Sequence, residues 1–321
     1  MTIAWRNILL LCILFFSFGC VSTRTNSFLI VRAGINDTPE ELAEKYLGDR
    51  DQAWRIREFN EIDQLTPGQQ VVIPTRPVDL GGLRADGSQA VPILVYNGFS
   101  RKQVPTRTII SRQNFVDQMQ YLKDNGYHVI SMPDFFDFLD FKKELPPKSV
   151  VLTFDDGWCS LYEIGFPVLQ EYGYPGTLFL YTDLIHDNTC LSWDQVREMQ
   201  KYGMTFGNHG KTHRDLSGPV DDENYSQYFA ALQLDVNAAE EVIKKELNII
   251  PGYFAYPYGA RSDLLIAYLQ KNGYRGGFKV APGGNPFYTN RFQIKRSVIY
   301  GDYDIESFAE KLDTFTRQKL Q

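Results

Sequence analysis

VVLTFDDGW, at residues 150–158, is the stretch of sequence that points both to a fold and to a chemistry. Its first five residues are largely apolar, and two adjacent carboxylates, Asp155 and Asp156, follow them before a glycine. An apolar run bounded by turn residues favours a parallel strand covered on both faces, and α/β barrels carry their active sites at the carboxyl ends of such strands. Because side chains alternate along an extended chain, the two acids are expected to point in different directions, so that one can hold a metal while the other handles a proton. Taken alone, the same residues also suit a surface turn between two strands.

The composition describes a globular chain that is large enough for more than one folded unit. It has 321 residues, of which 43% are hydrophobic and 14% aromatic, so it can bury a substantial core. The formal net charge of −6 and the lack of a long basic run argue against a nucleic-acid partner, because binding to a phosphate backbone depends on clustered Lys and Arg. The four cysteines include no CxxC pair, which argues against a cysteine-based zinc site.

Residues 1–20 have the pattern of an export signal. A short segment with one arginine precedes the apolar residues 8–18, and Gly19 and Cys20 close the segment. The apolar run is too short for a comfortable membrane span. FSFGCVST resembles a bacterial lipoprotein signal, which implies that Cys20 is lipidated and anchors the exported protein to a membrane of the cell envelope. An ordinary signal segment, cleaved or retained, is the alternative.

Export would place the chain in an oxidising compartment, where Cys159 and Cys190 could form a disulfide. Cys159 follows the acid pair, and Cys190 follows the apolar run at 177–181. Both cysteines would lie on the same rim of a barrel if these two strands are neighbours. Two separate thiols are the alternative.

Residues 27–75 are predicted to fold as a separate small unit. The apolar run 28–31 predicts a strand, and Thr-Pro-Glu-Glu at 38–41 starts a helix with a capping box and a proline in its first turn. A second helix is expected over 52–59 and a short strand over 71–73. The expected order is therefore strand, helix, helix, strand.

Three segments of this unit, FLIVRAGINDTPEELAEKYLGD, WRIREFNEI and LTPGQQVVIP, resemble a LysM module over nearly its full length. The resemblance implies that the unit binds polymers of N-acetylglucosamine (GlcNAc), peptidoglycan included, in a shallow groove. The GDTL of such modules is NDTP here, at residues 36–39. A βααβ spacer without a ligand is the alternative.

After a polar, Gly-containing segment at 76–90, which is expected to be a linker, residues 91–321 alternate between strands and helices. Strands are expected at 92–96, 128–131, 150–154, 177–181, 204–206, 253–256, 274–280 and 292–299. The helices between them include a short aromatic one at 133–141, expected to pack against the outside of the barrel, and a closing one at 304–318. This alternation implies a parallel sheet, and the number of units favours its closure into a (β/α) barrel.

Two histidines form the second chemical feature. His209 and His213 lie four residues apart in MTFGNHGKTHRDL, directly after an expected strand. At this spacing, two imidazoles can reach one side of a helical turn and hold one metal ion. Together with a carboxylate from the end of another strand, they would make a three-ligand site with open coordination positions.

The third feature is FAYPYG at 254–259, which again ends a strand and turns sharply. In the order TFDDG, HGKTH and YPYG, the three motifs resemble the polysaccharide deacetylase family, also called NodB-homology or carbohydrate esterase 4 enzymes. The resemblance covers residues 91 to about 315. It implies a distorted (β/α) barrel that removes N-acetyl groups from glucosamine polymers, or acetyl esters from xylan.

The resemblance also implies roles for individual residues. Asp155 matches the family's catalytic base, and Asp156, His209 and His213 match its metal ligands. The metal is expected to be zinc, with cobalt or nickel as alternatives. The backbone N–H of Tyr258 matches the group that, with the metal, faces the developing oxyanion.

Several positions depart from the family's pattern. Ala255 stands where an arginine often supports the base, so this support is expected to be missing. No histidine follows His213 to protonate the leaving amine, and the C-terminal segment RSVIYGDYDIESF has Tyr300 and Asp302 instead. Asn97 replaces a histidine often present in the early strand, while His186 could act as the acid or be an exposed loop residue.

Two classes of function follow. The first is a metal-dependent de-N-acetylase at the cell envelope that acts on peptidoglycan or an exopolysaccharide, with the LysM unit positioning it on its glycan. The second is a non-catalytic glycan-binding lipoprotein on a deacetylase scaffold, and the missing C-terminal histidine together with Ala255 motivates it.

Overall fold

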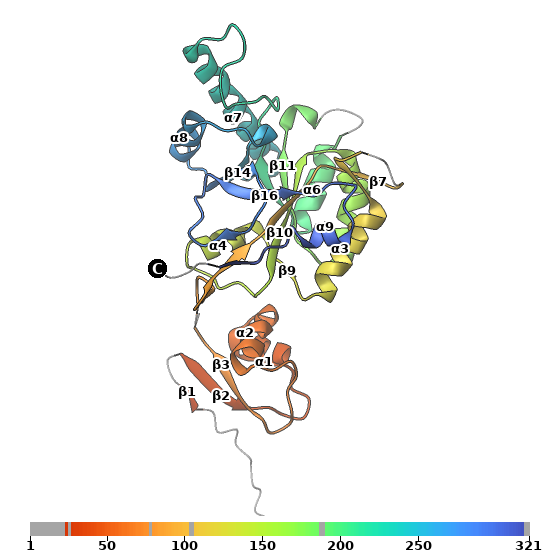
Figure 1. Cartoon of the computed structure of the whole chain (residues 1–321), viewed down its shortest axis with the longest axis vertical. Coiled ribbons are helices and arrows are strands. Elements are labelled where there is room, and N and C mark those ends of the chain that lie inside the picture. Colours follow the sequence, from red (N-terminus) through yellow and green to blue (C-terminus); the bar gives the residue numbers. More distant parts are fainter. Residues whose placement is uncertain (1–22, 25–26, 77–78, 103–105, 186–189, 318–321) are drawn as a thin grey trace, which may run out of the picture. The chain divides into compact units, whose positions relative to one another are not determined.

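The computed structural model describes residues 23–24, 27–76, 79–102, 106–185 and 190–317, and it divides into the units Met1–Val78 and Asp79–Gln321 (Figure 1). The predicted signal segment with Cys20 and the loop histidine His186 lie outside the described residues. Within the described ranges, no helix is long and apolar enough to cross a membrane.

The first unit has the predicted order of strand, helix, helix and strand. Its elements are β1 (Thr23–Arg24), β2 (Phe28–Arg32), α1 (Pro39–Leu47), η1 (Arg50–Gln52), α2 (Ala53–Asn60) and β3 (Gln70–Pro74). Strands β2 and β3 pair antiparallel. The predicted capping box is present, since Thr38 Oγ1 accepts from the Glu41 backbone and Glu41 accepts from the Thr38 backbone. The helices bury Leu42 and Ile56 against the strands.

A closed barrel of parallel strands forms the second unit, as predicted. Its strands are β6 (Ile93–Tyr96), β10 (Ser149–Asp156), β11 (Thr177–Leu180), β12 (Thr205–Asn208), β13 (Tyr253–Ala255), β14 (Gly276–Val280) and β16 (Ile294–Val298). They pair in the order β10-β11-β12-β13-β14-β16-β6, and β6 returns to β10. Only Asn208 and Phe254 are in register between β12 and β13, so the barrel is distorted at this seam. A short strand, β9 (His128–Val129), pairs with β10 outside the ring.

The helical segments of this unit are α3 (Arg112–Asp124), α4 (Met132–Leu139), η2 (Leu161–Gly165), α5 (Phe166–Tyr172), η3 (Thr182–Leu184), α6 (Trp193–Lys201), α7 (Tyr225–Leu247), η4 (Pro257–Gly259), α8 (Asp263–Lys271) and α9 (Ile305–Ala309). Most of them surround the barrel, and two outer apolar clusters lie between these helices and the sheet. One cluster joins α3, α5 and α6 to the sheet, and the other joins α7 and α8 to it. In Figure 1 these two groups of helices lie on different sides of the barrel.

Two expectations about the ends of this unit are wrong. Part of the predicted linker 76–90 forms β4 (Leu83–Arg84) and β5 (Gly87–Val91), and the predicted helix 304–318 is the short α9 followed by β17 (Phe315–Arg317). Strand β5 pairs with β4, β17 and β15 (Asn285–Pro286) in a separate small sheet. Gly87, one of the glycines that suggested a linker, is required by packing within this sheet. A Cβ at this position would lie 2.2 Å from the carbonyl oxygen of Thr316. A second small pair joins β7 (Gly98–Ser100) to β8 (Ile109–Ser111).

Helix α4 was expected to pack against the outside of the barrel, and this is wrong. Its Phe136 shares a cluster with Val151, Phe179 and Phe278, which come from β10, β11 and β14. Val151 lies on the same face of β10 as Asp155, whose side chain meets others inside the barrel. Gly276 makes room for this helix, since a Cβ there would lie 2.5 Å from the Phe136 ring. Helix α4 therefore fills the interior of the barrel from one end.

Replacing Phe136 with alanine is expected to lower the free energy of unfolding by about 3–5 kcal/mol, because the change leaves a cavity among fully buried rings. Denaturant titration of the purified chain measures this. Phe141→Ala is the matched control, since Phe141 is 48% exposed and should lose much less. Equal losses for the two variants would contradict the interior position of α4.

Candidate active site

In the second unit, the predicted base Asp155 is paired with an arginine that the sequence did not reveal. Arg296, on β16, donates from Nη1 to Asp155 Oδ1 at 2.6 Å and from Nη2 to Asp155 Oδ2 at 2.8 Å. Arg296 is fully buried, and its guanidinium lies 5.1 Å from the ring centroid of Phe179. The expectation that arginine support is missing because of Ala255 is therefore wrong. The available signal was a basic residue within the strand segment IKRSV.

This pairing determines the charge of the base. Burial raises the pKa of Asp155, but the positive charge of Arg296 and its hydrogen bonds lower it, with a further contribution from His209. The net pKa lies below the ordinary value of an aspartate. Asp155 is thus an ionised carboxylate at neutral pH even though it is buried, which a proton acceptor requires.

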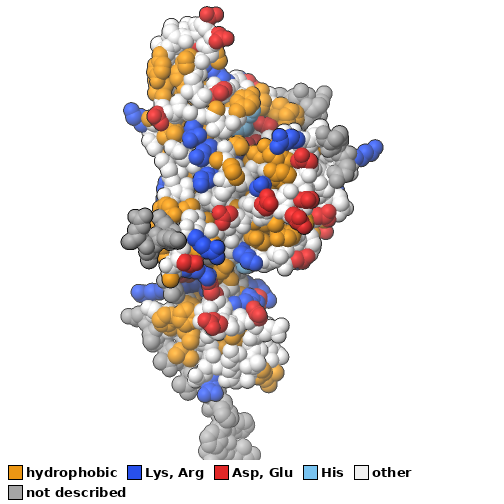
Figure 2. Space-filling model, viewed as in Figure 1, with side chains coloured by type: hydrophobic (Ala, Val, Ile, Leu, Met, Phe, Trp, Pro, Cys, Tyr) orange, Lys and Arg blue, Asp and Glu red, His pale blue; other side chains and the backbone are white. Residues whose placement is uncertain are grey.

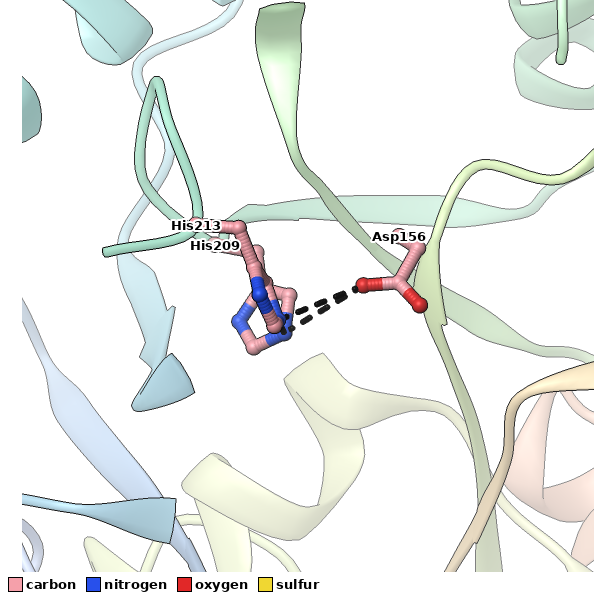
Figure 3. Close-up of side chains that lie close together, drawn as sticks. All are labelled: Asp156, His209 and His213. Atoms are coloured by element: carbon pink, nitrogen blue, oxygen red, sulfur yellow. Dashed lines mark hydrogen bonds and ion pairs between the residues drawn. The ribbon is translucent and has the colours of Figure 1, made fainter. Parts of the chain in front are cut away.

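Asp156, His209 and His213 come together as predicted (Figure 3). Asp156 Oδ1 lies 3.7 Å from His209 Nε2 and 3.5 Å from His213 Nε2. The other carboxylate oxygen accepts from the indole N–H of Trp158 at 3.0 Å, which orients Oδ1 toward the imidazoles. One ligand atom from each of the three residues lies within 4.8 Å of the others.

The two acids take different partners, as their alternation along β10 suggested, but both approach the same histidine. Asp155 Oδ2 lies 3.8 Å from His209 Nε2, close to the distance from Asp156. A left-handed backbone at Asp156, with φ of 74°, turns its side chain away from strict alternation. The base therefore lies beside the candidate metal ligands.

The hydrogen bonds around the imidazoles fit a metal site. His209 Nδ1 lies 2.8 Å from the carbonyl oxygen of Ala255, which can only accept, so this nitrogen carries the proton. Nε2 of His209 then presents a lone pair, and it lies 3.2 Å from Nε2 of His213. The two Nε2 atoms are close enough for one cation to contact both. Burial and the neighbouring His209 also lower the pKa of His213 against the charge of Asp156, which favours the neutral, ligating form.

The histidines do not share a helical turn, contrary to the expectation from their spacing. His209 follows β12 directly, and His213 lies in an irregular loop with a left-handed φ of 57°. Asp235, on α7, holds this loop by accepting from the backbone N–H groups of Lys211 at 2.8 Å and Thr212 at 3.0 Å. Gly210 is needed there, because its φ is +84° and a Cβ would lie 2.5 Å from Asp235 Oδ1.

Asp235 thus positions His213 without touching the candidate metal site. Asp235→Asn is expected to weaken zinc binding by about 10–100-fold, because an amide cannot accept all the bonds that hold the loop. Isothermal titration with zinc measures the change. Asp183→Asn is the matched control, since the side chain of Asp183 contacts the same loop through an exposed ion pair with Lys211, and the substitution leaves its backbone bond to Lys211 in place. Unchanged zinc affinity in Asp235→Asn would contradict this positioning role.

Aromatic side chains border the histidine loop. The Tyr258 ring meets His213 edge to face at 4.6 Å between centroids, and the Tyr181 ring lies 5.5 Å from His213. Tyr258 has a left-handed φ of 58° and a side chain that is 71% exposed. The structure therefore places Tyr258 at the site, and the role of its backbone N–H stays a prediction.

The remaining residues singled out from the sequence lie outside the Asp-His-His cluster. Cys159 Sγ contacts the backbone carbonyl of Cys190, so the two residues are neighbours and their disulfide stays a prediction. Asn97 follows β6, beside Asp155 on the adjacent strand. Tyr300 packs on the guanidinium of Arg107 and does not join the histidine cluster. His128 begins β9, beside the amino end of β10, so among the described residues only His209 and His213 bring imidazoles to the site.

A closed parallel barrel that carries a buried base beside an Asp-His-His cluster at its strand ends defines an α/β-barrel enzyme site. Residues 142–277 match the family model Polysaccharide deacetylase. A poly-β-1,6-N-acetyl-D-glucosamine N-deacetylase of Staphylococcus aureus (strain MRSA252) is 26% identical over an alignment of 211 residues that covers 62% of this chain and 72% of the relative.

Solved structures support the same fold. The Streptococcus pyogenes deacetylase PplD has a TM-score of 0.63 and 24% identity, covering 70% of this chain and 98% of that protein. IcaB from Ammonifex degensii has a TM-score of 0.59 and 24% identity, covering 71% and 97%. The second unit is therefore similar to polysaccharide deacetylases in sequence over residues 142–277 and has the fold of these solved structures, which supports a hydrolase of this class.

Proposed function

We propose that this chain hydrolyses the N-acetyl groups of a GlcNAc-containing polysaccharide, either peptidoglycan or an exopolysaccharide, at the cell envelope. The observation that carries the proposal is the ionised Asp155, held by Arg296 beside Asp156, His209 and His213. The Staphylococcus aureus relative is an N-deacetylase of poly-β-1,6-N-acetyl-D-glucosamine, which supports an N-acetyl substrate.

Asp156, His209 and His213 would hold a divalent cation. Two imidazoles and one carboxylate are a ligand set that zinc adopts in catalytic sites, and cobalt or nickel can take the same ligands. Such a cation supplies Lewis-acid polarisation of the acetamide carbonyl and lowers the pKa of a water molecule.

Residues of the chain itself would accept a proton from the attacking water and donate one to the leaving amine. Asp155 takes a proton from the attacking water. The two guanidinium hydrogen bonds of Arg296 hold both carboxylate oxygens of Asp155 in place. Among the described residues of the site, no further histidine is available to protonate the leaving amine. Asp155 can return the proton itself, because its lowered pKa makes the protonated carboxyl a stronger acid than usual. The backbone N–H of Tyr258 would donate to the developing oxyanion, as its place at the site allows.

The remaining parts of the chain would bring this site to its polymer. The βααβ unit would bind GlcNAc polymers as a LysM module, which its element order and the three resembling segments support. The segment ending at Cys20 would export the protein and anchor it to a membrane by lipidation.

Acetate release tests the proposal. The purified chain is expected to release acetate from GlcNAc oligomers or peptidoglycan, to lose this activity on chelation and to regain it on adding zinc, cobalt or nickel. Oligomers with β-1,6 and β-1,4 linkages and intact peptidoglycan, compared at equal GlcNAc content, would rank the substrates. Absence of acetate release from every one of these polymers by the metal-loaded chain would overturn the proposal.

A further inference from the structure

Three cations, the basic patch Arg261, Lys279 and Lys295, lie together on the outer side of the barrel. Lys279 of β14 and Lys295 of β16 are register partners on adjacent parallel strands. Phe278 and Arg296, their neighbours in the chain, point into the barrel, so the alternation of side chains turns both lysines outward. On the face shown in Figure 2, basic side chains gather near α8 and β14.

No carboxylate neutralises the basic patch. Among the residues that the structure describes, none of the three cations has an ion-pair partner, and Arg261 Nη2 donates to the uncharged Gln293 Oε1 at 3.3 Å. Lys279 is half-buried, and burial lowers its pKa, as do the positive charges of Arg261 and Lys295. The charges that act on Lys279 within the described chain are therefore all positive.

This arrangement is unfavourable for the protein alone. Like charges on directly adjacent strand positions destabilise a sheet, and Lys279 also loses hydration without gaining an anion. The chain has 39 acidic residues against 33 basic ones, so a cluster of unpaired cations does not arise from an excess of basic residues. An anionic ligand would make the arrangement favourable, because it would supply the negative charge that the fold omits.

The basic patch adjoins the turn that borders the histidines. A Cβ at Gly259 would lie 2.9 Å from Val280 Cβ, so η4 packs directly on the end of β14. Tyr258, which precedes Gly259, is 71% exposed, and its ring centroid lies 4.6 Å from that of His213. Arg261 follows Tyr258 by three residues, which span at most about 11 Å. A polymer whose reacting unit lies at His213 would therefore reach the patch with a nearby unit.

Ammonium and guanidinium groups both bind carboxylates through charge-assisted hydrogen bonds. A polymer of GlcNAc alone carries no negative charge and would gain nothing from the basic patch. We propose that the basic patch binds carboxylates of an acidic GlcNAc-containing polysaccharide beside the reacting unit. This inference rests on the proposed function and narrows its substrate. The carboxylates would come from the lactyl and peptide groups of peptidoglycan or from the uronic acids of an exopolysaccharide.

Acetate release by the zinc-loaded full chain from matched substrates tests the proposal. Soluble peptidoglycan fragments and oligomers of alternating GlcNAc and glucuronate are each compared with the same material after amidation of its carboxylates, which removes the charge and keeps the sugars. For one of the two substrates, KM is expected to be about fivefold lower in the charged form, the effect of a few partly exposed ion contacts, and to rise with salt. The substrate with this difference identifies the source of the carboxylates.

Two double variants separate the basic patch from the overall charge. Lys279→Gln with Lys295→Gln should remove the difference in KM between charged and amidated substrates. Its rate on neutral GlcNAc oligomers should stay the same, and its melting temperature should not fall, because two like charges are removed. Lys244→Gln with Lys245→Gln, the same change at exposed lysines of α7, should keep the difference.

Equal KM values for the charged and amidated forms of both substrates would overturn the proposal, as would a difference that survives in the patch variant. Binding to anionic phospholipid vesicles that is lost in the patch variant, without any change in KM, would assign the patch to a membrane instead. Calorimetric binding of the charged substrates to Asp155→Asn, with and without the patch substitutions, does not need turnover. If this binding depends on the patch and acetate release fails, the patch assignment stands and the proposed function falls.

Discussion

Asp155→Asn is expected to reduce the rate of acetate release by about 10²–10⁴-fold, the usual contribution of a general base. An asparagine fills the same space, but it cannot take a proton from water. The candidate metal ligands Asp156, His209 and His213 are unchanged, so zinc affinity should stay close to that of the wild type. Initial rates on GlcNAc oligomers, together with a zinc titration, measure both quantities.

The neighbouring acid is the matched comparison. Asp156→Asn is also expected to stop turnover, but through loss of zinc affinity, because Asp156 is one of three candidate ligands. A variant Asp155→Asn that kept more than a tenth of the wild-type rate would refute the assignment of the base. The variant also leaves the buried Arg296 without its charged partner, which lowers the free energy of unfolding by about 3–5 kcal/mol. Rates are therefore compared well below its melting temperature.

Arg296→Met is expected to lower the rate of acetate release at neutral pH by about 10²-fold or more, since it removes the positive charge that keeps the base Asp155 ionised. Burial raises the pKa of Asp155, and the charge and hydrogen bonds of Arg296 are the main opposing influence. Without Arg296, the pKa of Asp155 is expected to rise, so a smaller fraction of the carboxyl can accept a proton at neutral pH. The acid limb of the rate profile should then move to higher pH, with activity recovering as the pH rises.

Arg296→Lys distinguishes the effect of the positive charge from the effect of the two parallel hydrogen bonds that the guanidinium makes to Asp155. A lysine keeps a positive charge but cannot make the two parallel bonds that Arg296 makes to Asp155, so a smaller shift in the same direction is expected. Rate profiles of the wild type and the two variants over the acid range measure the shift. An acid limb at the same pH in all three proteins would show that Arg296 does not control the charge of Asp155.

Most of the candidate site could be predicted from the sequence, because its members lie in short motifs. Asp155 and Asp156 are adjacent, and His209 and His213 are four residues apart. Each pair ends or follows a parallel strand, and the carboxyl ends of such strands meet at one rim of a barrel. The local backbone was less predictable, since the left-handed conformations of Asp156 and His213 depend on the surrounding loops.

Arg296 could not be predicted in the same way. It lies 141 residues after Asp155, and IKRSV reads as a strand with a basic residue that could face solvent. The inward position follows from the pairing of β16 with β6, and of β6 with β10, which brings Arg296 across the barrel to the base. The interior position of α4 has a similar origin, since a run of aromatic residues does not indicate which face of a barrel it will cover.

The amino-acid sequence by itself determined the alternation of strands and helices, the parallel barrel and the residues that can act as base and metal ligands. These features depend on apolar periodicity, capping residues and motif spacing, which are local properties of the chain. The tertiary structure alone decided that Arg296 holds the base and that Asp235 anchors the histidine loop. These contacts join distant segments, and only closure of the barrel and packing of its helices bring such segments together.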